Sequence, residues 1–386
     1  MNDNRIIITE YDGKTLMAVY EEEKYRSFSF IDETDIPVGS IINARVDSRL
    51  DNLDALFVCL DGKEMGYLEG SKDRVGSLIP VMIQKSALKN KRCVVTKELS
   101  IKGVTCIVSD GTGKSRCSKK LSESEKKRLL KLIESHHVSG KYDVVIRTNA
   151  AYVSDASITE EYERLCGKLD EIHYYSEKRT AYNVLYKQYG SICEQILKLN
   201  LSRSYKVITD KKDVFDTLKE ELYDQMPGEL KERFDLTYYT DELCSLNAMY
   251  SIKNNLEEAL QKKVWLKSGG YLYIEETEAL NVIDVNSGKI QKKGEKEDTV
   301  KRTNLEAVCE AARQIRLRNL SGIILIDLIN MKNGSDREEI IQNLVTEIKK
   351  DPIQTDFHDV TKLGLIELTR KREQISLRES IGNKNK

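Results

Sequence analysis

The segment EALNVIDVNSGK (residues 278–289) places an acid in the middle of an apolar run. Its apolar residues predict a buried β-strand, because short runs of branched side chains between turn residues favour extended structure. Alternate side chains of a strand share a face. Asp284 and Asn286 are therefore expected to point one way, while Ile283 and Val285 point the other.

A second segment, GIILIDLINM (residues 322–331), repeats the arrangement with Asp327 in an apolar frame. Two acids on neighbouring strands repel each other, and a buried carboxylate is costly unless a cation or hydrogen bonds compensate. Mg²⁺ fits this need, because it is typically held by one or two carboxylates with water and substrate phosphate. Asn286 could orient Asp284. The alternative is that each aspartate only caps a helix or ends a strand.

The flanking sequence predicts a layered α/β domain over residues 256–386, because strand patterns alternate there with helical ones. Three short strands are expected in residues 1–36, with a D-G turn between the first two. Three strands alone are only marginally stable. The segment SRSYKVITD (residues 202–210) is their plausible partner, and this pairing would make the intervening residues an insertion.

Residues 38–109 carry five short strand patterns, from GSIINARVDSRL to VTCIVSD. Such a series suggests a small closed barrel of the OB type, whose exposed strands often present aromatic rings to single-stranded nucleic acid. Phe57 and Tyr67 are candidates for base stacking, and Lys102 is a candidate for contact with the backbone charge. Phe57 has an alternative, because it lies inside LFVCL, where the spacing alone favours a core position.

The segment YDVVIRTNA (residues 142–150) predicts a strand that ends in Arg147 and Thr148, whose guanidinium and hydroxyl groups suit a phosphate. The alternative for such an arginine is a surface salt bridge. Ser122 and Glu125 have the spacing of a capping box, which predicts a helix start. The nearby GTGKS lacks the first glycine of a phosphate-binding loop. A long helix is expected over residues 158–199.

The composition is that of a globular protein, with 386 residues, 40% of them hydrophobic and 32% charged. Lys and Arg number 62 against 63 Asp and Glu. A nucleic-acid partner must therefore meet a local basic surface. The basic residues around the two acids are Lys289, Lys292, Lys293, Lys296, Lys301, Arg302, Arg313, Arg316, Arg318, Arg370, Lys371 and Arg372. The alternative for most of them is a solvated helix face paired with glutamates.

No apolar run approaches the ~20 residues of a membrane span, and the amino-terminal residues lack the apolar centre of a signal peptide. A cytoplasmic location is therefore expected. The eight cysteines form no C-x-x-C pair, and the four histidines show no metal-ligand spacing. Reduced thiols and no zinc site are expected.

Several motifs carry a likeness to a known family. SGGYLYIEETEALNVIDVNSGK, TNLEAVCEAARQIRLRNLSGIILIDLINM, LGLIELTRKREQISL and VVIRT resemble the RNase E/G family of bacterial endoribonucleases, in the same order along the chain. The resemblance implies an α/β multidomain fold. Its parts would be an RNase H-like subdomain (1–36 and 191–255), an inserted S1-type OB-fold barrel (37–109), a 5′-sensor region (110–190) and a DNase I-like catalytic subdomain (256–386).

The resemblance also implies roles for individual residues. Asp284 and Asp327 would hold the catalytic Mg²⁺, and Asn286 would support Asp284. The 5′-monophosphate of RNA would be held by Arg147 and Thr148. The resemblance also implies contacts with RNA for Phe57, Tyr67 and Lys102, where Tyr67 replaces the family's usual phenylalanine and keeps a stacking face. From the basic group around the acids, Arg370 and Arg372 are also expected to contact RNA.

The implied function is a Mg²⁺-dependent endoribonuclease that cleaves single-stranded RNA and is stimulated by a 5′-monophosphate. Its substrates would be ribosomal and transfer RNA precursors and messenger RNA, and its products would carry 5′-phosphates. The alternatives are a non-catalytic RNA-binding protein that retains the fold, and a DNA nuclease. The likeness does not extend to the cysteine motif through which family members share zinc, so a zinc-linked assembly is not expected. A monomer and a metal-free homodimer both stay open.

Overall fold

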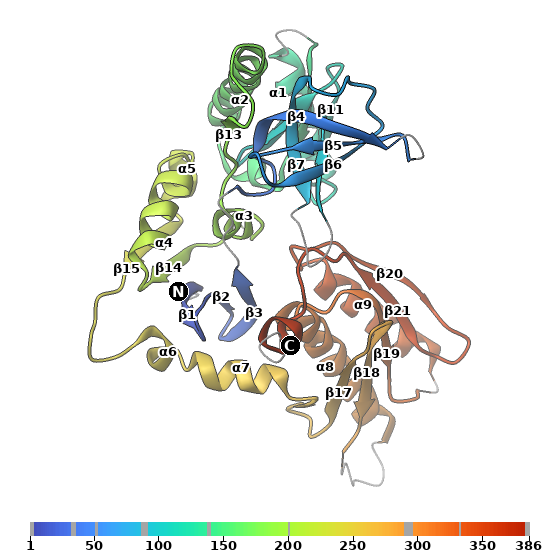
Figure 1. Cartoon of the computed structure of the whole chain (residues 1–386). Helices are drawn as coiled ribbons and strands as arrows, with labels where there is room; N and C mark the ends of the chain where they lie inside the picture. Colours follow the sequence, from blue (N-terminus) through green and yellow to red (C-terminus); the bar gives the residue numbers. More distant parts are fainter. Residues whose placement is uncertain are drawn as a thin grey trace. The chain divides into compact units, whose positions relative to one another are not determined.

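The computed structural model describes residues 4–31, 36–50, 53–85, 92–136, 140–199, 201–288, 296–331 and 333–382. The chain forms two compact units, both visible in Figure 1. Unit 1 comprises Met1–Ile31, Tyr205–Phe215 and Asp235–Lys386, and unit 2 comprises Asp32–Ser204 and Asp216–Phe234. None of the helices in the described ranges has the length and apolar content of a membrane-spanning segment.

Unit 1 contains a five-stranded sheet that joins the start of the chain to its middle. Its strands are, in spatial order, β15 (Phe234–Tyr238), β14 (Tyr205–Thr209), β1 (Arg5–Tyr11), β2 (Lys14–Glu21) and β3 (Lys24–Ile31). The parallel pairing of β1 with β14 confirms that the segment around residues 205–209 completes the opening strands. Asp12 and Gly13 turn the β1–β2 hairpin with φ of 58° and 75°, the left-handed values for which D-G pairs are preferred.

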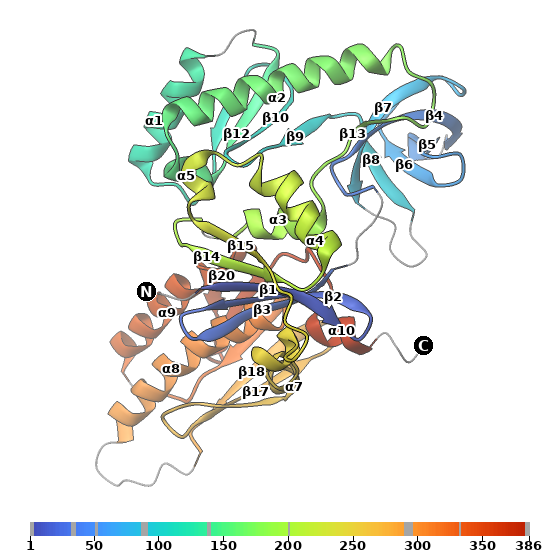
Figure 2. The ribbon, with the colours of Figure 1, turned by 90° about the vertical axis from the view of Figure 1, so that its left-hand side faces the viewer.

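The second sheet of unit 1 has six strands and carries the two acids. Its strands are, in spatial order, β16 (Lys263–Trp265), β17 (Tyr271–Glu276), β18 (Leu280–Asn286), β19 (Gly322–Asp327), β21 (Ile366–Arg370) and β20 (Thr355–Val360). The parallel strands β18 and β19 are joined through α8 (Lys296–Leu317), and α9 (Gly334–Ile348) follows β19. These two helices lie side by side in Figures 1 and 2. The remaining helices are α4 (Lys212–Thr217), α6 (Leu246–Met249), α7 (Ile252–Leu260) and α10 (Leu377–Gly382).

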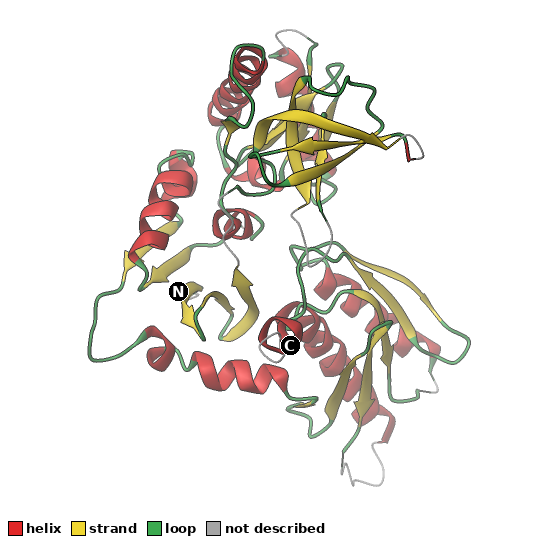
Figure 3. Cartoon of the chain, viewed as in Figure 1, coloured by secondary structure: helices red, strands yellow, loops and turns green. Residues whose placement is uncertain are grey.

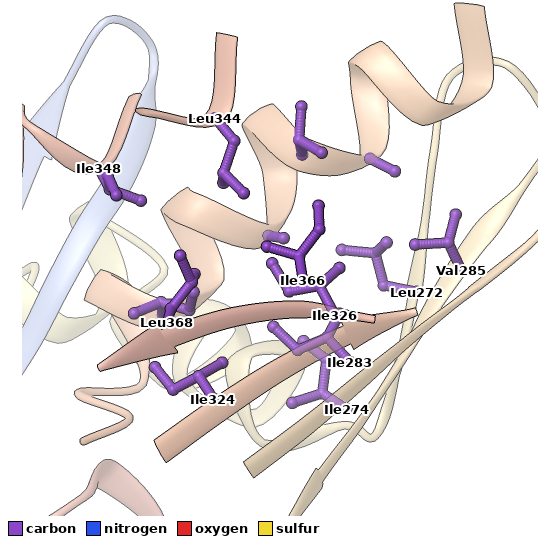
Figure 4. Packing of buried hydrophobic residues seen from close by; sticks show 14 of the residues in the cluster. Leu272, Ile274, Ile283, Val285, Ile324, Ile326, Leu344, Ile348, Ile366 and Leu368 are labelled. Carbon is purple, nitrogen blue, oxygen red and sulfur yellow. The ribbon is translucent and has the colours of Figure 1, made fainter. Parts of the chain in front are cut away.

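An apolar layer between this sheet and its helices sets the register of the strands. Ile283, Ile326 and Ile366 point into it, as Figure 4 shows, and all three are fully buried. Burying such a side chain contributes about 1.5–3 kcal/mol. A slip of one residue in β18 would expose Ile283 and bury Asp284, so the apolar face of this strand holds the acid on the opposite face.

Unit 2 contains a closed barrel, seen among the strands of Figure 3. Its strands are β4 (Ile41–Leu50), β5 (Ala55–Cys59), β6 (Met65–Glu69), β8 (Cys93–Thr96) and β7 (Leu78–Lys85), which pairs back with β4. A further strand, β13 (Val184–Tyr186), pairs with β4. The closed five-stranded barrel confirms the OB-like element of the predicted fold.

A separate four-stranded sheet in unit 2 corrects the predicted extent of the barrel. Its order is β11 (Ser115–Cys117), β12 (Tyr142–Ile146), β10 (Cys106–Asp110) and β9 (Ser100–Lys102). VTCIVSD, predicted as the last barrel strand, is therefore β10 of another sheet. A buried carboxylate accounts for the difference: Glu161 accepts hydrogen bonds from the amides of Val104 and Thr105 at 2.8 and 2.6 Å, and so binds the β9–β10 turn to a helix.

The helices of unit 2 also differ from the prediction. They are α1 (Glu123–Ser135), η2 (Thr148–Tyr152), α2 (Asp155–Ser176), α3 (Ser191–Leu197), η3 (Leu218–Tyr223) and α5 (Gly228–Lys231). The capping box of Ser122 and Glu125 is present at α1. The single helix predicted over residues 158–199 is wrong, because β13 interrupts it. The Asn43 amide donates to the carbonyls of Ser176 and Arg179 at 3.1 and 2.9 Å and so satisfies the end of α2.

Candidate active site

The two acids of the sequence prediction lie directly opposite each other. Asp284 of β18 and Asp327 of β19 are register partners in a parallel pair. Neighbouring strands are ~4.8 Å apart, and side chains at paired positions point to the same face. Asp284 is half-buried and Asp327 is exposed. Two carboxylates therefore meet on the face of the sheet that is opposite the apolar layer.

Asn286 holds the first of these carboxylates, as predicted. Its side-chain Nδ2 donates to Oδ2 of Asp284 at 2.7 Å. The bond restrains the rotation of the carboxylate and offsets some of its negative charge. The structure thus places Asn286 in contact with Asp284, and its role as a supporting group for a metal ligand stays a prediction.

The donor set suits a hard divalent cation. Two carboxylates and a neighbouring amide oxygen are the chemistry that Mg²⁺ prefers, and Mg²⁺ usually keeps several water or phosphate ligands. The described ranges contain no group of three or more His, Cys, Asp or Glu residues that could hold a metal ion. Asp284 and Asp327 are the residues that could offer carboxylate ligands to a cation at this position.

Asn304 of α8 positions the chain just after Asp327, and the sequence analysis missed it. Its side chain is fully buried. The amide donates to the carbonyl of Ile329 at 2.8 Å and accepts from the amide N–H of Ile329 at 3.1 Å. These two hydrogen bonds to one residue hold the loop that follows β19 in place. A polar residue on the apolar side of a helix was the available signal in the sequence.

Close contact with neighbouring atoms explains the second glycine of the SGGY segment, Gly270. A Cβ at Gly270 would lie 2.8 Å from the carbonyl oxygen of Asn286 and 2.9 Å from a methyl group of Thr303. The same turn is held by Glu306 of α8, which accepts from the amides of Lys267 and Ser268 at 2.5 and 2.9 Å. The turn between β16 and β17 therefore packs tightly beside the end of β18.

Most described members of the basic group are structural. Lys301 pairs with Asp336 and Glu339 at 2.8 Å each, which supports the alternative of a paired helix face. Further cations bind carboxylates or carbonyls inside unit 1: Arg313 with Glu310, Arg316 with Glu21, and Arg318 with Gln314 and Gln261. Burial lowers the pKa of Arg318 to about 10. Arg302 is exposed, whereas Lys289, Lys292, Lys293 and the side chain of Lys296 lie outside the described residues.

The structure corrects the prediction that Arg370 contacts RNA. Its side chain is buried, with 3% exposure, on the core side of β21. The guanidinium donates to Asp351 at 2.8 Å and to Asn319 Oδ1 at 2.6 Å. It also donates to the carbonyl of Leu320 at 3.1 Å. Arg370 therefore has a structural role, while Arg372 is exposed and keeps a side chain that RNA could reach.

Phe57 and Tyr67 form an aromatic pair on the outside of the barrel. They are register partners on β5 and β6, with ring centroids 6.2 Å apart in an edge-to-face arrangement. Both are half-exposed and outside the barrel core, so the core alternative for Phe57 is wrong. The Arg92 guanidinium lies 4.1 Å from the Phe57 ring centroid. The sequence analysis missed Arg92, although a cation directly before a strand was visible.

Lys102 lies outside the barrel to which the prediction assigned it. It belongs to β9 of the four-stranded sheet and pairs with Glu194 at 2.9 Å. Burial raises the pKa of the Glu194 carboxyl, but Lys198 and Lys102 outweigh burial and hold it below its ordinary value. The ammonium group of Lys102 is thus already paired with a carboxylate inside unit 2, which weakens its attraction for an RNA backbone.

Arg147 and Thr148 follow β12 and are half-buried. The Arg147 guanidinium donates to the carbonyl of Gly103 and to that of Leu197, and burial lowers its pKa below the ordinary value. The Thr148 hydroxyl donates to Ser118 Oγ at 3.1 Å. Arginine has five N–H donors, so two carbonyls leave donors for a phosphate. The surface salt-bridge alternative does not describe this environment.

The chain is similar to known ribonucleases along most of its length. The profile of the Ribonuclease E/G family matches residues 100–373. Ribonuclease G of Haemophilus influenzae is 30% identical over 367 residues, covering 88% of this chain and 73% of the relative. Ribonuclease G of Escherichia coli (strain K12) is 28% identical over 374 residues, covering 90% of this chain and 75% of the relative. Ribonuclease E of Synechocystis sp. is 28% identical over 362 residues, covering 89% of this chain and 54% of the relative. Because the family profile spans more than half of its residues, the chain belongs to the Ribonuclease E/G family.

Proposed function

We propose that the chain is a Mg²⁺-dependent endoribonuclease that cleaves single-stranded RNA. The observation that carries this proposal is the register pairing of Asp284 with Asp327, supported by the bond from Asn286. A protein that only binds RNA has no use for two mutually repelling carboxylates on an exposed sheet face. The names of the relatives, all ribonucleases, support the same choice.

Each residue of the site has a separate task. Asp284 and Asp327 would bind the cation through their carboxylates, and Asn286 would keep the Asp284 carboxylate in one orientation. When bound, Mg²⁺ supplies Lewis-acid chemistry at a phosphodiester. Asn304 would hold the loop after Asp327 in place through Ile329. We expect products with 5′-phosphate and 3′-hydroxyl ends.

The direct test is cleavage of an end-labelled single-stranded RNA with and without Mg²⁺. We expect internal cuts only with Mg²⁺, and none in a DNA of the same sequence. Tight binding of the RNA without any cut would support the non-catalytic alternative. Cuts in DNA at the same rate would instead favour a nuclease without preference for RNA.

Replacing Asn286 with alanine should slow cleavage by about 10- to 100-fold, the usual cost of removing a group that orients a metal ligand. The physical reason is the loss of the 2.7 Å bond to Asp284. Initial cleavage rates measured over a range of Mg²⁺ concentrations check this. The mutant should need more Mg²⁺ for half-maximal rate, and an unchanged Mg²⁺ requirement would contradict the orienting role.

The chain should cleave 5′-monophosphorylated RNA faster than the matched 5′-hydroxyl RNA, because Arg147 and Thr148 offer donors to the phosphate. Arg147→Lys keeps the charge and loses the planar fork. We expect this change to remove most of the preference, about 10-fold or more for a charge-assisted bond. Competition between the two RNAs measures it. A preference that survives in the mutant would place the 5′ contact elsewhere.

We further propose that the five-stranded sheet of unit 1 belongs to an RNase H-like subdomain and the six-stranded sheet to a DNase I-like subdomain. Two observations support this division. The first sheet is completed across the inserted residues by β14, and the second carries the acid pair in a mostly continuous stretch of chain. The barrel, with Phe57, Tyr67 and Arg92 on its outside, would bind the RNA strand.

A further inference from the structure

Three aromatic residues and a lysine lie beside the acid pair on the same face of the sheet. Lys263, Tyr273, Asp284 and Asp327 are successive register partners across β16, β17, β18 and β19. Trp265, Tyr271 and Asn286 form the next row across the first three of these strands. Side chains at paired positions share a face, and adjacent strands are ~4.8 Å apart. The aromatic rows therefore begin one strand away from Asp284.

These side chains point away from the core. Leu272 and Ile274, which alternate with the tyrosines, are buried in the apolar layer. Trp265 is 65% exposed and Tyr273 is 38% exposed. A single exposed aromatic residue is ordinary, but a cluster of them on one face normally marks a binding surface.

A cation is part of the same cluster. Lys263 Nζ lies 3.8 Å from the ring centroids of both Trp265 and Tyr271, whose rings meet edge to face at 5.4 Å. Its neighbour Lys262 is neutralised by Glu275 at 2.7 Å. Within the described ranges Lys263 pairs with no carboxylate, so its charge is available to an anion. Aromatic rings with an adjacent cation are the chemistry that binds single-stranded nucleic acid.

We propose that Lys263, Trp265, Tyr271 and Tyr273 form a platform on which bases of the RNA stack next to the scissile phosphate. This inference rests on the proposed endoribonuclease function and adds a substrate-binding surface to the same site. RNA is the occupant because the cluster combines stacking faces with a free positive charge. It is also continuous with Asp284 and Asn286, where the phosphate must lie. A purely apolar partner would have no need for Lys263.

The unique tryptophan makes the platform directly observable, because the chain contains one Trp. In a chain carrying Asp327→Asn, which should hold RNA without cutting it, a single-stranded oligoadenylate should quench the emission of Trp265. Trp265→Leu should weaken binding of labelled RNA by about 5- to 150-fold, the range that corresponds to loss of one base stack. Trp265→Phe should restore much of the binding. Leu243→Ala, a change at a fully exposed loop position, is the matched control and should have no effect.

Kinetics separate this proposal from the proposed function. With Asp284 and Asp327 intact, Trp265→Leu should raise KM for RNA while kcat stays close to that of the parent chain. If the parent chain cuts RNA but shows neither quenching nor a KM change in the mutant, the platform is refuted and the nuclease stands. If the parent chain cuts no RNA, the proposed function fails instead. Emission that changes with protein concentration in the absence of RNA would assign the face to a second copy of the chain and would overturn the proposal.

Discussion

Asp327→Asn should lower the rate of RNA cleavage by at least ~1,000-fold, equivalent to ~4 kcal/mol of activation free energy, while RNA binding stays intact. The substitution preserves the size of the side chain and removes its charge. Asp327 is exposed at the end of β19, so its replacement disturbs no packing. The loss would come from the metal site alone, because Asp284 by itself offers a single carboxylate to the cation.

Cleavage of end-labelled RNA in Mg²⁺ and anisotropy of the same RNA measure the two quantities separately. Asp356→Asn is the matched control, since Asp356 is an exposed aspartate on β20 of the same sheet. It should cleave RNA at the parent rate. A parallel loss of binding and cleavage in Asp327→Asn would point to misfolding or to a structural role for the acid, and would contradict the metal-ligand assignment.

Arg370→Met should lower the free energy of unfolding by about 3–5 kcal/mol, the cost of breaking a buried ion pair by removing one partner. Methionine fills much of the space but leaves the Asp351 carboxylate buried without its cation. It also removes the donors to Asn319 and Leu320. A structural arginine of this kind affects every activity of the protein through stability.

Urea unfolding of the full chain measures this change, with Arg372→Met as the matched control. Arg372 is exposed two positions further on, so its replacement should change stability by less than ~0.5 kcal/mol. If Arg370→Met instead retains full stability and loses RNA binding, the prediction that Arg370 contacts RNA is correct and its structural role is refuted.

Local patterns in the sequence were sufficient for several features. The alternation around Asp284 correctly separated the polar face of β18 from its apolar face, since the two-residue period is a property of any extended backbone. The D-G turn and the capping box were also found, because both depend on residues within three positions of each other. The family likeness predicted that the two acids belong to one metal site, and the structure shows that they are register partners on adjacent strands.

The sequence analysis missed features that depend on contacts between residues far apart in the chain. The strand β10 was assigned to the barrel because an apolar strand looks the same in any sheet, and only its pairing with β9 and β12 identifies the sheet to which it belongs. Phe57 could have faced either side, since a run of five apolar residues contains no alternation. Arg370 lies in a run of basic residues, and nothing in that run distinguishes a buried arginine from an exposed one.

The linear sequence was enough to predict two acid-bearing strands, a barrel-forming region and a likeness to a ribonuclease family. Residue periodicity and motif spacing are properties of the chain that do not depend on how it folds. Strand order and register arise from contacts between residues that are far apart in the chain. Therefore only the tertiary structure shows that Asp284 lies opposite Asp327 and that Trp265 lies in the adjacent row of the sheet. Only the tertiary structure shows that Arg370 is buried.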